Sequence, residues 1–262
     1  MPLSAARVSE LAQRLEAAAL ERRTERKLTE TEPALTLTDA YDVQWALRQL
    51  RIRAGARLSG LKMGLTSRAK MKQMGVDSPI YGFLLDEYAA AADGEVATST
   101  LIHPRVEPEI ALVTAKDLRG PGCTIAHALA AIDFAVPAME IIDSRYQDFN
   151  FDLPSVVADN GSAAGYVVGT SARRVQDLDL RTLGVVVEKN GEGVAFGAGA
   201  AVLGHPVLSL TMLANLLAER EQFIPAGTYV MTGGITEAVK AQSGDRFVTR
   251  FHGLGSVSVR FV

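Results

Sequence analysis

Two glutamates stand at the entrance of an apolar run, in the segment HPRVEPEIALV (residues 103–113). Glu107 and Glu109 are separated by one residue, and on a β-strand residues i and i+2 face the same side of the sheet. Two carboxylates on one face repel each other unless a cation joins them. Any fold of this chain must therefore bring positive charge to the point where this strand enters the core.

A third glutamate, Glu140, lies inside another apolar and strand-like run, AVPAMEIIDSRY. An unpaired carboxylate in such a run is costly, so Glu140 needs a partner. One interpretation is a salt bridge to a lysine or an arginine. The other is that Glu107, Glu109 and Glu140 converge on one divalent cation. Because oxygen ligands favour hard ions, the second interpretation predicts Mg²⁺ or Mn²⁺ rather than zinc.

One lysine stands in an otherwise apolar, glycine-rich segment, GLKMGLTS (residues 60–67). A lysine usually lies on the surface, but the apolar neighbours of Lys62 indicate a buried strand, where an ammonium group needs an anion. Thr66 and Ser67 follow it, and they can offer hydroxyl and backbone donors to a carboxylate. The segment is therefore a second candidate element of a site.

The first part of the chain has a helical pattern. Residues 4–23 carry apolar side chains at near-helical spacing, which predicts an amphipathic helix: Val8, Leu11, Leu15 and Leu20. A second helix is expected after it, with Thr38 as its N-cap and Gly55 at its end. We predict a helical N-terminal region, residues 1–56, in front of a second domain, residues 57–262.

The second part has the pattern of a mainly β structure. Runs such as EIALVTA, TYVMTGG and RFVTRFHGLGSVSVRFV are strand-like, and Gly, Pro, Asn and Asp separate them. Asn190-Gly191, between two such runs, is typical of a β-hairpin. Helices are expected at residues 124–132 and 209–220, the latter with Ser209 as its cap. The predicted class is α+β, with mixed and mostly antiparallel strands and a few packed helices.

Composition argues against several classes of protein. The 262 residues are 48% hydrophobic and 22% charged, a mixture that supports a substantial core. A net charge of −3 gives no general attraction to nucleic acid or to an anionic membrane. Cys123 is the single cysteine, so no disulfide framework is expected. The first residues show no signal-type apolar core, and charges are expected to interrupt every apolar run, which predicts no membrane partner and a cytoplasmic location.

Six segments follow one another along the chain in the order of a known set of motifs: GLKMGLTSRAKMKQMGVDSPIYGFL, HPRVEPEIALV, AVPAMEIIDSRY, DNGSAAGYVVG, GAGAAVLGHPVLSLTMLANLL and IPAGTYVMTGGIT. Together they resemble the hydratase/decarboxylase branch of the fumarylacetoacetate hydrolase superfamily, which serves the meta-cleavage degradation of aromatic compounds. The resemblance runs from about Thr38 to Val262. It implies a mixed β-roll or distorted barrel of the fumarylacetoacetase C-terminal-domain type, with flanking helices and a helical N-terminal region.

The resemblance also implies a site. The E-x-E metal ligands of the family fall on Glu107 and Glu109, its third acidic ligand on Glu140, and its lysine on Lys62. Further residues are candidates for substrate contact, some with an equally plain explanation as turn or strand-end residues: Leu65, Thr66, Ser67, Asn160, Ser162 and Thr232. His103 precedes the E-x-E and is a candidate for supporting it, whereas His252 receives no role.

Within the branch, the motifs look most like those of enzymes that decarboxylate 2-oxo-3-hexenedioate (4-oxalocrotonate), a small 2-oxo dicarboxylic acid. The resemblance implies release of CO₂ and 2-hydroxypenta-2,4-dienoate, with Mg²⁺ or Mn²⁺ and Lys62 stabilising the developing dienolate. It also implies a homo-oligomer and a complex with 2-oxopent-4-enoate hydratase. Hydratase activity itself is the alternative, and a non-catalytic, metal-stabilised partner protein is the second. Residues 62–102 contain no histidine, which disfavours the superfamily's hydrolase chemistry.

Overall fold

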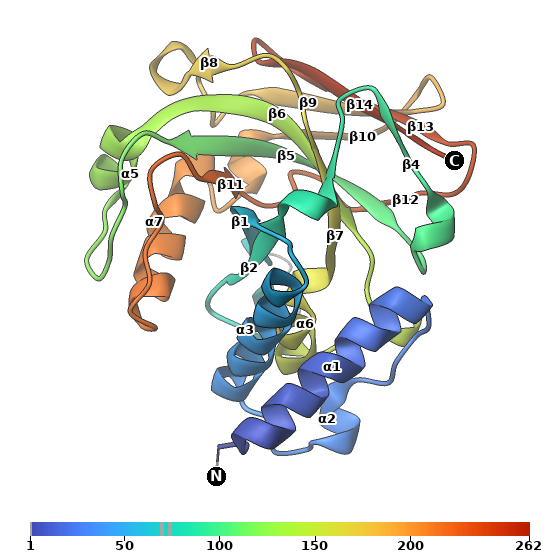
Figure 1. The fold of residues 1–262 in the computed structure, drawn as a ribbon. Coiled ribbons are helices and arrows are strands. Elements are labelled where there is room, and N and C mark those ends of the chain that lie inside the picture. The colour runs from blue at the N-terminus through green and yellow to red at the C-terminus, as the bar shows by residue number, and fades with distance from the viewer. Residues whose placement is uncertain (1, 69–70, 73–74) are drawn as a thin grey trace.

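The computed structural model describes residues 2–68, 71–72 and 75–262, and it places two curved sheets above a group of N-terminal helices (Figure 1). These helices are α1 (Ala5–Glu21), α2 (Leu28–Thr31) and α3 (Leu37–Arg53). Three more helices lie against the strands: α5 (Ile125–Ala131), α6 (Leu153–Ala158) and α7 (Pro206–Ala218).

The larger sheet carries the strands that contain the candidate site residues. Its spatial order is β2 (Ile80–Leu85), β1 (Leu58–Gly64), β11 (Tyr229–Met231), β5 (Arg105–Thr114), β6 (Ile132–Ile142), β7 (Ala163–Val168) and β3 (Ala89–Ala90). Two short strands extend it, β12 (Val239–Lys240) beside β5 and β8 (Arg173–Arg174) beside β6. The second sheet has the order β10 (Glu192–Ala198), β9 (Gly184–Lys189), β13 (Arg246–Phe251), β14 (Gly255–Phe261) and β4 (Gly94–Val96).

Most neighbouring strands run antiparallel. Parallel pairs join β1 to β11, β3 to β7 and β4 to β14. The predicted hairpin forms between β9 and β10, where Asn190 and Gly191 both have positive φ, as the tight turn between twisted strands requires. The α+β class and the mixed, mostly antiparallel and curled sheet arrangement are confirmed.

Two helix starts differ from the sequence prediction. Helix α3 is capped by Thr36 rather than Thr38, because the Thr36 hydroxyl and the side chain three residues later form a reciprocal capping box. Helix α7 is capped by the side chain of His205 rather than Ser209. It begins with Pro206, whose missing N–H costs nothing in the first turn, so the helix starts three residues before Ser209.

The helical N-terminal region shares its core with the β structure. The inward face of α1 is buried at Leu11, Ala12, Leu15 and Ala18, and it belongs to one apolar cluster with residues of α3, β2 and α6. Leu20, expected on the same face, is 65% exposed. Since this chain covers that face itself, α1 gives no argument for an oligomer. The division at residues 56 and 57 stays a prediction.

The predicted helix at residues 209–220 belongs to a longer apolar segment whose length the sequence prediction missed. Residues Gly199–Ala218 contain no charged side chain, contrary to our expectation that charges interrupt every apolar run, and by length and composition they could cross a membrane. However, 56% of the segment is buried inside the protein. The inward side chains of α7, among them Leu210, Leu213 and Leu217, lie in the main hydrophobic core. The segment therefore packs as a core helix.

A matched pair of leucines on α1 tests the shared core. Leu15→Ala removes a side chain that is 1% exposed, so we expect it to lower the free energy of unfolding by about 2–5 kcal/mol through lost burial and a cavity. Leu20→Ala, on the same helix but exposed, should change it by less than about 0.5 kcal/mol. Urea unfolding of both variants measures the difference, and equal values would contradict the packing described for α1.

Candidate active site

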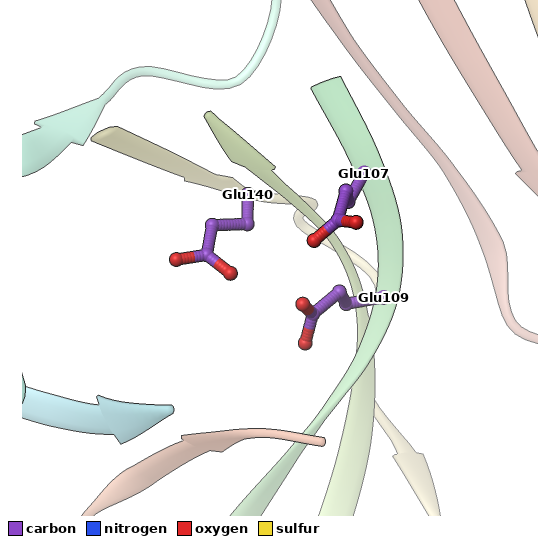
Figure 2. A group of neighbouring side chains, drawn as sticks. All are labelled: Glu107, Glu109 and Glu140. Carbon is purple, nitrogen blue, oxygen red and sulfur yellow. The ribbon is translucent and has the colours of Figure 1, made fainter. Parts of the chain in front are cut away.

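Three glutamates from two neighbouring strands converge on one point. In the antiparallel register of β5 and β6, Glu107 lies directly opposite Glu140, and Glu109 follows two residues along β5. Each glutamate offers one carboxylate oxygen, and these three atoms all lie within 4.8 Å of one another. Figure 2 shows Glu107 and Glu109 leaving the same strand, with Glu140 beside them. The predicted convergence is therefore present in the fold.

The cluster contains oxygens that lack a hydrogen-bond donor. Glu109 is fully buried, and its Oε2 accepts a hydrogen bond of 2.7 Å from the backbone N–H of Gly233. Among the described residues, Glu109 Oε1 and Glu140 Oε2 meet no donor. Buried polar atoms are rarely left without a partner, because the cost is a large part of their hydration energy. Carboxylate oxygens of this kind suit a hard divalent cation.

The electrostatics of the cluster lead to the same conclusion. Burial raises the pKa of Glu109 well above its usual value, and the nearby charges of Glu140 and Glu107 raise this pKa further. Burial also raises the pKa of Glu140, although the ammonium group of Lys62 opposes this. A divalent cation would supply the positive charge that keeps these carboxylates ionised.

Lys62 lies on β1 and points into the same region. Its side chain is only 3% exposed, and its Nζ lies 2.5 Å from Glu140 Oε1. It also donates a hydrogen bond of 2.9 Å to the carbonyl of Gly161. Glu140 therefore forms the salt bridge of the first interpretation and also belongs to the carboxylate cluster of the second. The glycine opposite Lys62 in β2, Gly82, leaves room for its stem.

The loop that holds the ammonium group is strained. Asn160, Gly161 and Ser162 all have positive φ, at 52°, 60° and 62°. The Asn160 side chain fixes this loop to β2, since it accepts from the N–H of Phe83 at 2.9 Å and donates to the Phe83 carbonyl at 3.0 Å. Left-handed backbone at non-glycine residues persists only where the surroundings enforce it, and here it presents the Gly161 carbonyl to the lysine.

A cavity of about 460 Å³ opens above the cluster. Its lining includes Lys62 and Glu107 together with four of the six predicted substrate contacts: Leu65, Thr66, Ser67 and Ser162. The Ser162 hydroxyl has no hydrogen-bond partner in the described structure, so it is free to meet a ligand.

Asn160 and Thr232 do not line this cavity. Asn160 is engaged with Phe83, and the Thr232 hydroxyl donates to the carbonyl of Ile110 at 2.8 Å. The residue after Thr232, Gly233, has φ of +115°, and a side chain there would collide with Thr66. This glycine supplies the N–H that binds Glu109. Direct contact of Asn160 and Thr232 with substrate stays a prediction.

Sequence reasoning missed several residues of the cavity wall, among them Arg105 and Phe149. Arg105 lies two residues before Glu107 on β5, so the alternation of a strand could have placed it on the same face. Phe149 ends the short 3₁₀ turn Gln147–Phe149 after β6, and no periodic signal marks it.

Comparison with known proteins agrees with this geometry. The family model described as fumarylacetoacetate (FAA) hydrolase C-terminal matches residues 62–262. The chain belongs to this family. The family match begins at Lys62 and includes Glu107, Glu109 and Glu140, so the whole cluster lies within it.

Comparison with individual relatives shows which enzymes of the family this chain resembles. A 4-oxalocrotonate decarboxylase of Pseudomonas putida is 55% identical over 260 residues, covering 99% of this chain and 98% of the relative. A 4-oxalocrotonate decarboxylase from Pseudomonas putida G7, solved in complex with magnesium and adipate, superposes with a TM-score of 0.98 at 53% identity, over 99% of each chain. A 2-hydroxyhexa-2,4-dienoate hydratase of Comamonas testosteroni is 37% identical over 251 residues, or 95% of each chain.

The raised pKa values predict how the metal-free protein responds to pH. Since the pKa of Glu109 is higher in the folded chain, that state binds more protons than the unfolded chain at pH above the usual pKa of 4.5. Stability should therefore fall as the pH rises through this range. Chelator-treated protein should show a melting temperature that drops between about pH 5 and pH 8.

Two controls isolate the cluster as the cause. Glu109→Gln, which removes the titrating group but keeps its shape, should flatten the decline, and added Mg²⁺ should reverse it in the unaltered protein. A decline of the same size in Glu109→Gln would contradict this assignment.

Proposed function

We propose that this chain catalyses the metal-dependent decarboxylation of 2-oxo-3-hexenedioate (4-oxalocrotonate) to 2-hydroxypenta-2,4-dienoate and CO₂. One observation carries the proposal: a buried cluster of three glutamates beside Lys62 opens into a cavity, in a chain 55% identical over nearly its full length to a 4-oxalocrotonate decarboxylase. The magnesium in the similar solved enzyme supports Mg²⁺ as the cofactor, and Mn²⁺ prefers the same oxygen ligands.

Glu107, Glu109 and Glu140 would hold the metal. When bound, it supplies a Lewis acid close to the C1 carboxylate and C2 oxygen of the substrate. In the reaction the bond between C5 and C6 of the substrate breaks, CO₂ leaves, and the electron pair moves through the double bond onto the C2 oxygen. The protein must stabilise the negative charge that develops on this oxygen.

The contacts of Lys62 support a role in that task. Two of its three ammonium hydrogens are donated to Glu140 and to the Gly161 carbonyl. The third can be donated to a substrate oxygen in the cavity. A fixed ammonium group in a site closed to water stabilises a developing oxyanion strongly, because no solvent has to reorganise. It can also return a proton to the dienolate.

The remaining predicted residues have two kinds of role. Thr66, Ser67 and Ser162 offer polar groups at the cavity wall, and Leu65 offers an apolar surface, so these four contact the substrate. Asn160 and Thr232, whose direct contact with substrate stays a prediction, also support the site through the backbone next to them, since Asn160 fixes the loop of Gly161 and Thr232 precedes the glycine that binds Glu109.

Hydratase activity is the competing candidate. It is favoured by relatives such as the 37% identical hydratase, and a metal and a lysine would also stabilise the negative charge that develops when water adds to a related 2-oxo acid. The higher identity to decarboxylases supports decarboxylation as the main activity. A non-catalytic, metal-stabilised partner protein is the last alternative.

One assay separates the three. Protein loaded with Mg²⁺ is mixed in separate reactions with 4-oxalocrotonate and with 2-hydroxypenta-2,4-dienoate, while CO₂ release and the absorbance of the dienol are followed. CO₂ release that depends on the protein supports the proposal. Hydration of 2-hydroxypenta-2,4-dienoate without CO₂ release identifies a hydratase, and no conversion of either compound identifies a partner protein.

We also propose that the chain forms a homo-oligomer in the cytoplasm and associates with a 2-oxopent-4-enoate hydratase, which would consume its product. The buried and unpaired Cys123 agrees with a reducing compartment. Light scattering of the protein alone and mixed with the hydratase tests the association. A monomeric mass at all micromolar concentrations, unchanged by mixing, would contradict it.

The role of Lys62 gives a specific prediction. Lys62→Met should lower kcat about 10²–10³-fold, the usual loss when one donor to a developing oxyanion is removed. Lys62→Arg should recover little of this, because a guanidinium is wider and does not release a proton at neutral pH. Lys116→Met, at an exposed position, is the matched control.

Metal affinity and melting temperature, measured on the same variants, separate chemistry from support. If Lys62 only braces Glu140, Lys62→Met should weaken Mg²⁺ binding and stability while kcat at saturating Mg²⁺ stays near normal. That result would falsify the catalytic role of Lys62.

A further inference from the structure

Two cationic side chains line the cavity in the described part of the chain, and they differ in their partners. Lys62 is paired with Glu140 and bonded to the Gly161 carbonyl. Arg105, which is half-buried, makes no ion pair with any described carboxylate. Its guanidinium carbon instead lies 3.9 Å from the centre of the Phe149 ring. A planar group with five N–H donors is therefore available at the cavity wall.

The aromatic ring under Arg105 is itself held firmly. The His103 ring packs against Phe149 with a centroid distance of 4.6 Å. His103 Nε2 lies 2.7 Å from the carbonyl of Ser144, which only accepts, so this nitrogen donates. Phe149 thus packs against both the His103 ring and the Arg105 guanidinium, and these contacts define its orientation.

The backbone at Phe149 supports a functional role for this arrangement. Phe149 and the preceding Asp148 both have positive φ, at 57° and 56°. For a bulky residue such as phenylalanine this conformation is unfavourable and persists only when the surrounding structure enforces it. Such strain tends to occur at ligand sites. Here its result is an aromatic platform that lines the cavity and supports a guanidinium.

The charges of the centre explain why another cation is needed. Lys62 is already paired with Glu140, and a metal held by the glutamates would meet the head of the substrate, so neither charge is available to a second carboxylate of the substrate. A carboxylate that enters a cavity without a partner is strongly disfavoured. A diacid with one end at the metal therefore requires a cation some distance away.

Arg105 has the right position for the other end. It lies two residues from Glu107 on β5, on the same face, with a Cα spacing of about 7 Å along the strand. We propose that Arg105, stacked on Phe149, forms an ion pair with the distal carboxylate of a six-carbon 2-oxo diacid and so selects diacids over monoacids. The inference rests on the proposed function, and it identifies the substrate class through a residue outside the metal centre.

The kinetic consequence follows from the fate of that carboxylate. The ion pair exists in the bound substrate, but it weakens as the carboxylate becomes neutral CO₂. It therefore stabilises the bound substrate at least as much as the transition state, so it does not lower the barrier between them. Removing it should raise KM without lowering kcat. Removing an ion pair that acted only in the transition state would instead lower kcat and leave KM little changed.

A matched pair of ligands tests the proposal. 2-Oxoadipate and 2-oxohexanoate share the head that would meet the metal and differ in the distal carboxylate. With Mg²⁺-loaded protein, we expect 2-oxoadipate to inhibit more strongly. In Arg105→Gln its inhibition constant should rise roughly 10- to 100-fold, the loss typical of a charge-assisted hydrogen-bonded pair. The constant for 2-oxohexanoate should stay unchanged, and KM for 4-oxalocrotonate should rise with that for 2-oxoadipate.

Further variants show whether a loss of affinity comes from the missing ion pair or from damage to the fold or the metal centre. Arg105→Lys should recover part of the preference, because it keeps the charge but loses the planar fork. Phe149→Leu keeps the guanidinium without its platform and should give a smaller loss in the same direction. Arg173→Gln, an exposed arginine, should behave like the unaltered protein. Melting temperature and Mg²⁺ affinity of each variant show whether the fold and the metal centre survive, and if Arg105→Gln does not fold, Arg105→Lys and Phe149→Leu carry the test.

The possible outcomes separate this inference from the proposed function. Equal losses of affinity for 2-oxoadipate and 2-oxohexanoate in Arg105→Gln would place Arg105 at the head of the substrate and overturn the inference. Unaltered protein that binds the two ligands equally well would overturn it too. A fall in kcat as large as the fall in kcat/KM would overturn it as well. If the protein releases no CO₂ from 4-oxalocrotonate but still prefers the diacid through Arg105, the proposed function fails and the selectivity stands.

Discussion

The contact between Lys62 and the buried glutamates is the interaction on which the rest of the site depends. It places one positive charge among three carboxylates from strands β5 and β6, where the surroundings provide too few donors to satisfy every oxygen. Lys62 alone cannot satisfy the buried oxygens of Glu109 and Glu140, and a divalent cation would correct this deficit. The strands that create the deficit also shape the cavity above it, and metal binding and substrate binding are therefore built on the same backbone.

Much of this arrangement follows from local sequence rules. The alternation of a strand places Glu107 and Glu109 on one face, and the apolar neighbours of Lys62 indicate its burial. Asn190-Gly191 specifies its hairpin through backbone conformation alone. The class of fold and the three metal-site candidates could therefore be predicted, because each depends on a short period or on a familiar set of motifs.

Other features depend on contacts that no local rule supplies. Thr36 and Thr38 both lie at the start of α3, and the distinction between them as N-cap rests on a capping box that only Thr36 completes. Asn160 could have bonded within its own turn, but it bonds to β2, far away in the sequence. The stacking of Arg105 on Phe149 requires a left-handed backbone at a bulky residue, which propensities argue against. In each case the tertiary structure chooses among partners that the sequence leaves equivalent.

The bond between Asn160 and Phe83 has a consequence for protein engineering. Phe83 packs in the apolar cluster that the N-terminal helices share with β2 and α6, and its backbone holds the side chain that fixes the loop of Gly161. The family match begins only at Lys62, after those helices. A chimaera that joins the β structure of this chain to the leading helices of a distant relative would thus inherit an altered support beneath its lysine. The leading helices and the β structure should be exchanged as one unit.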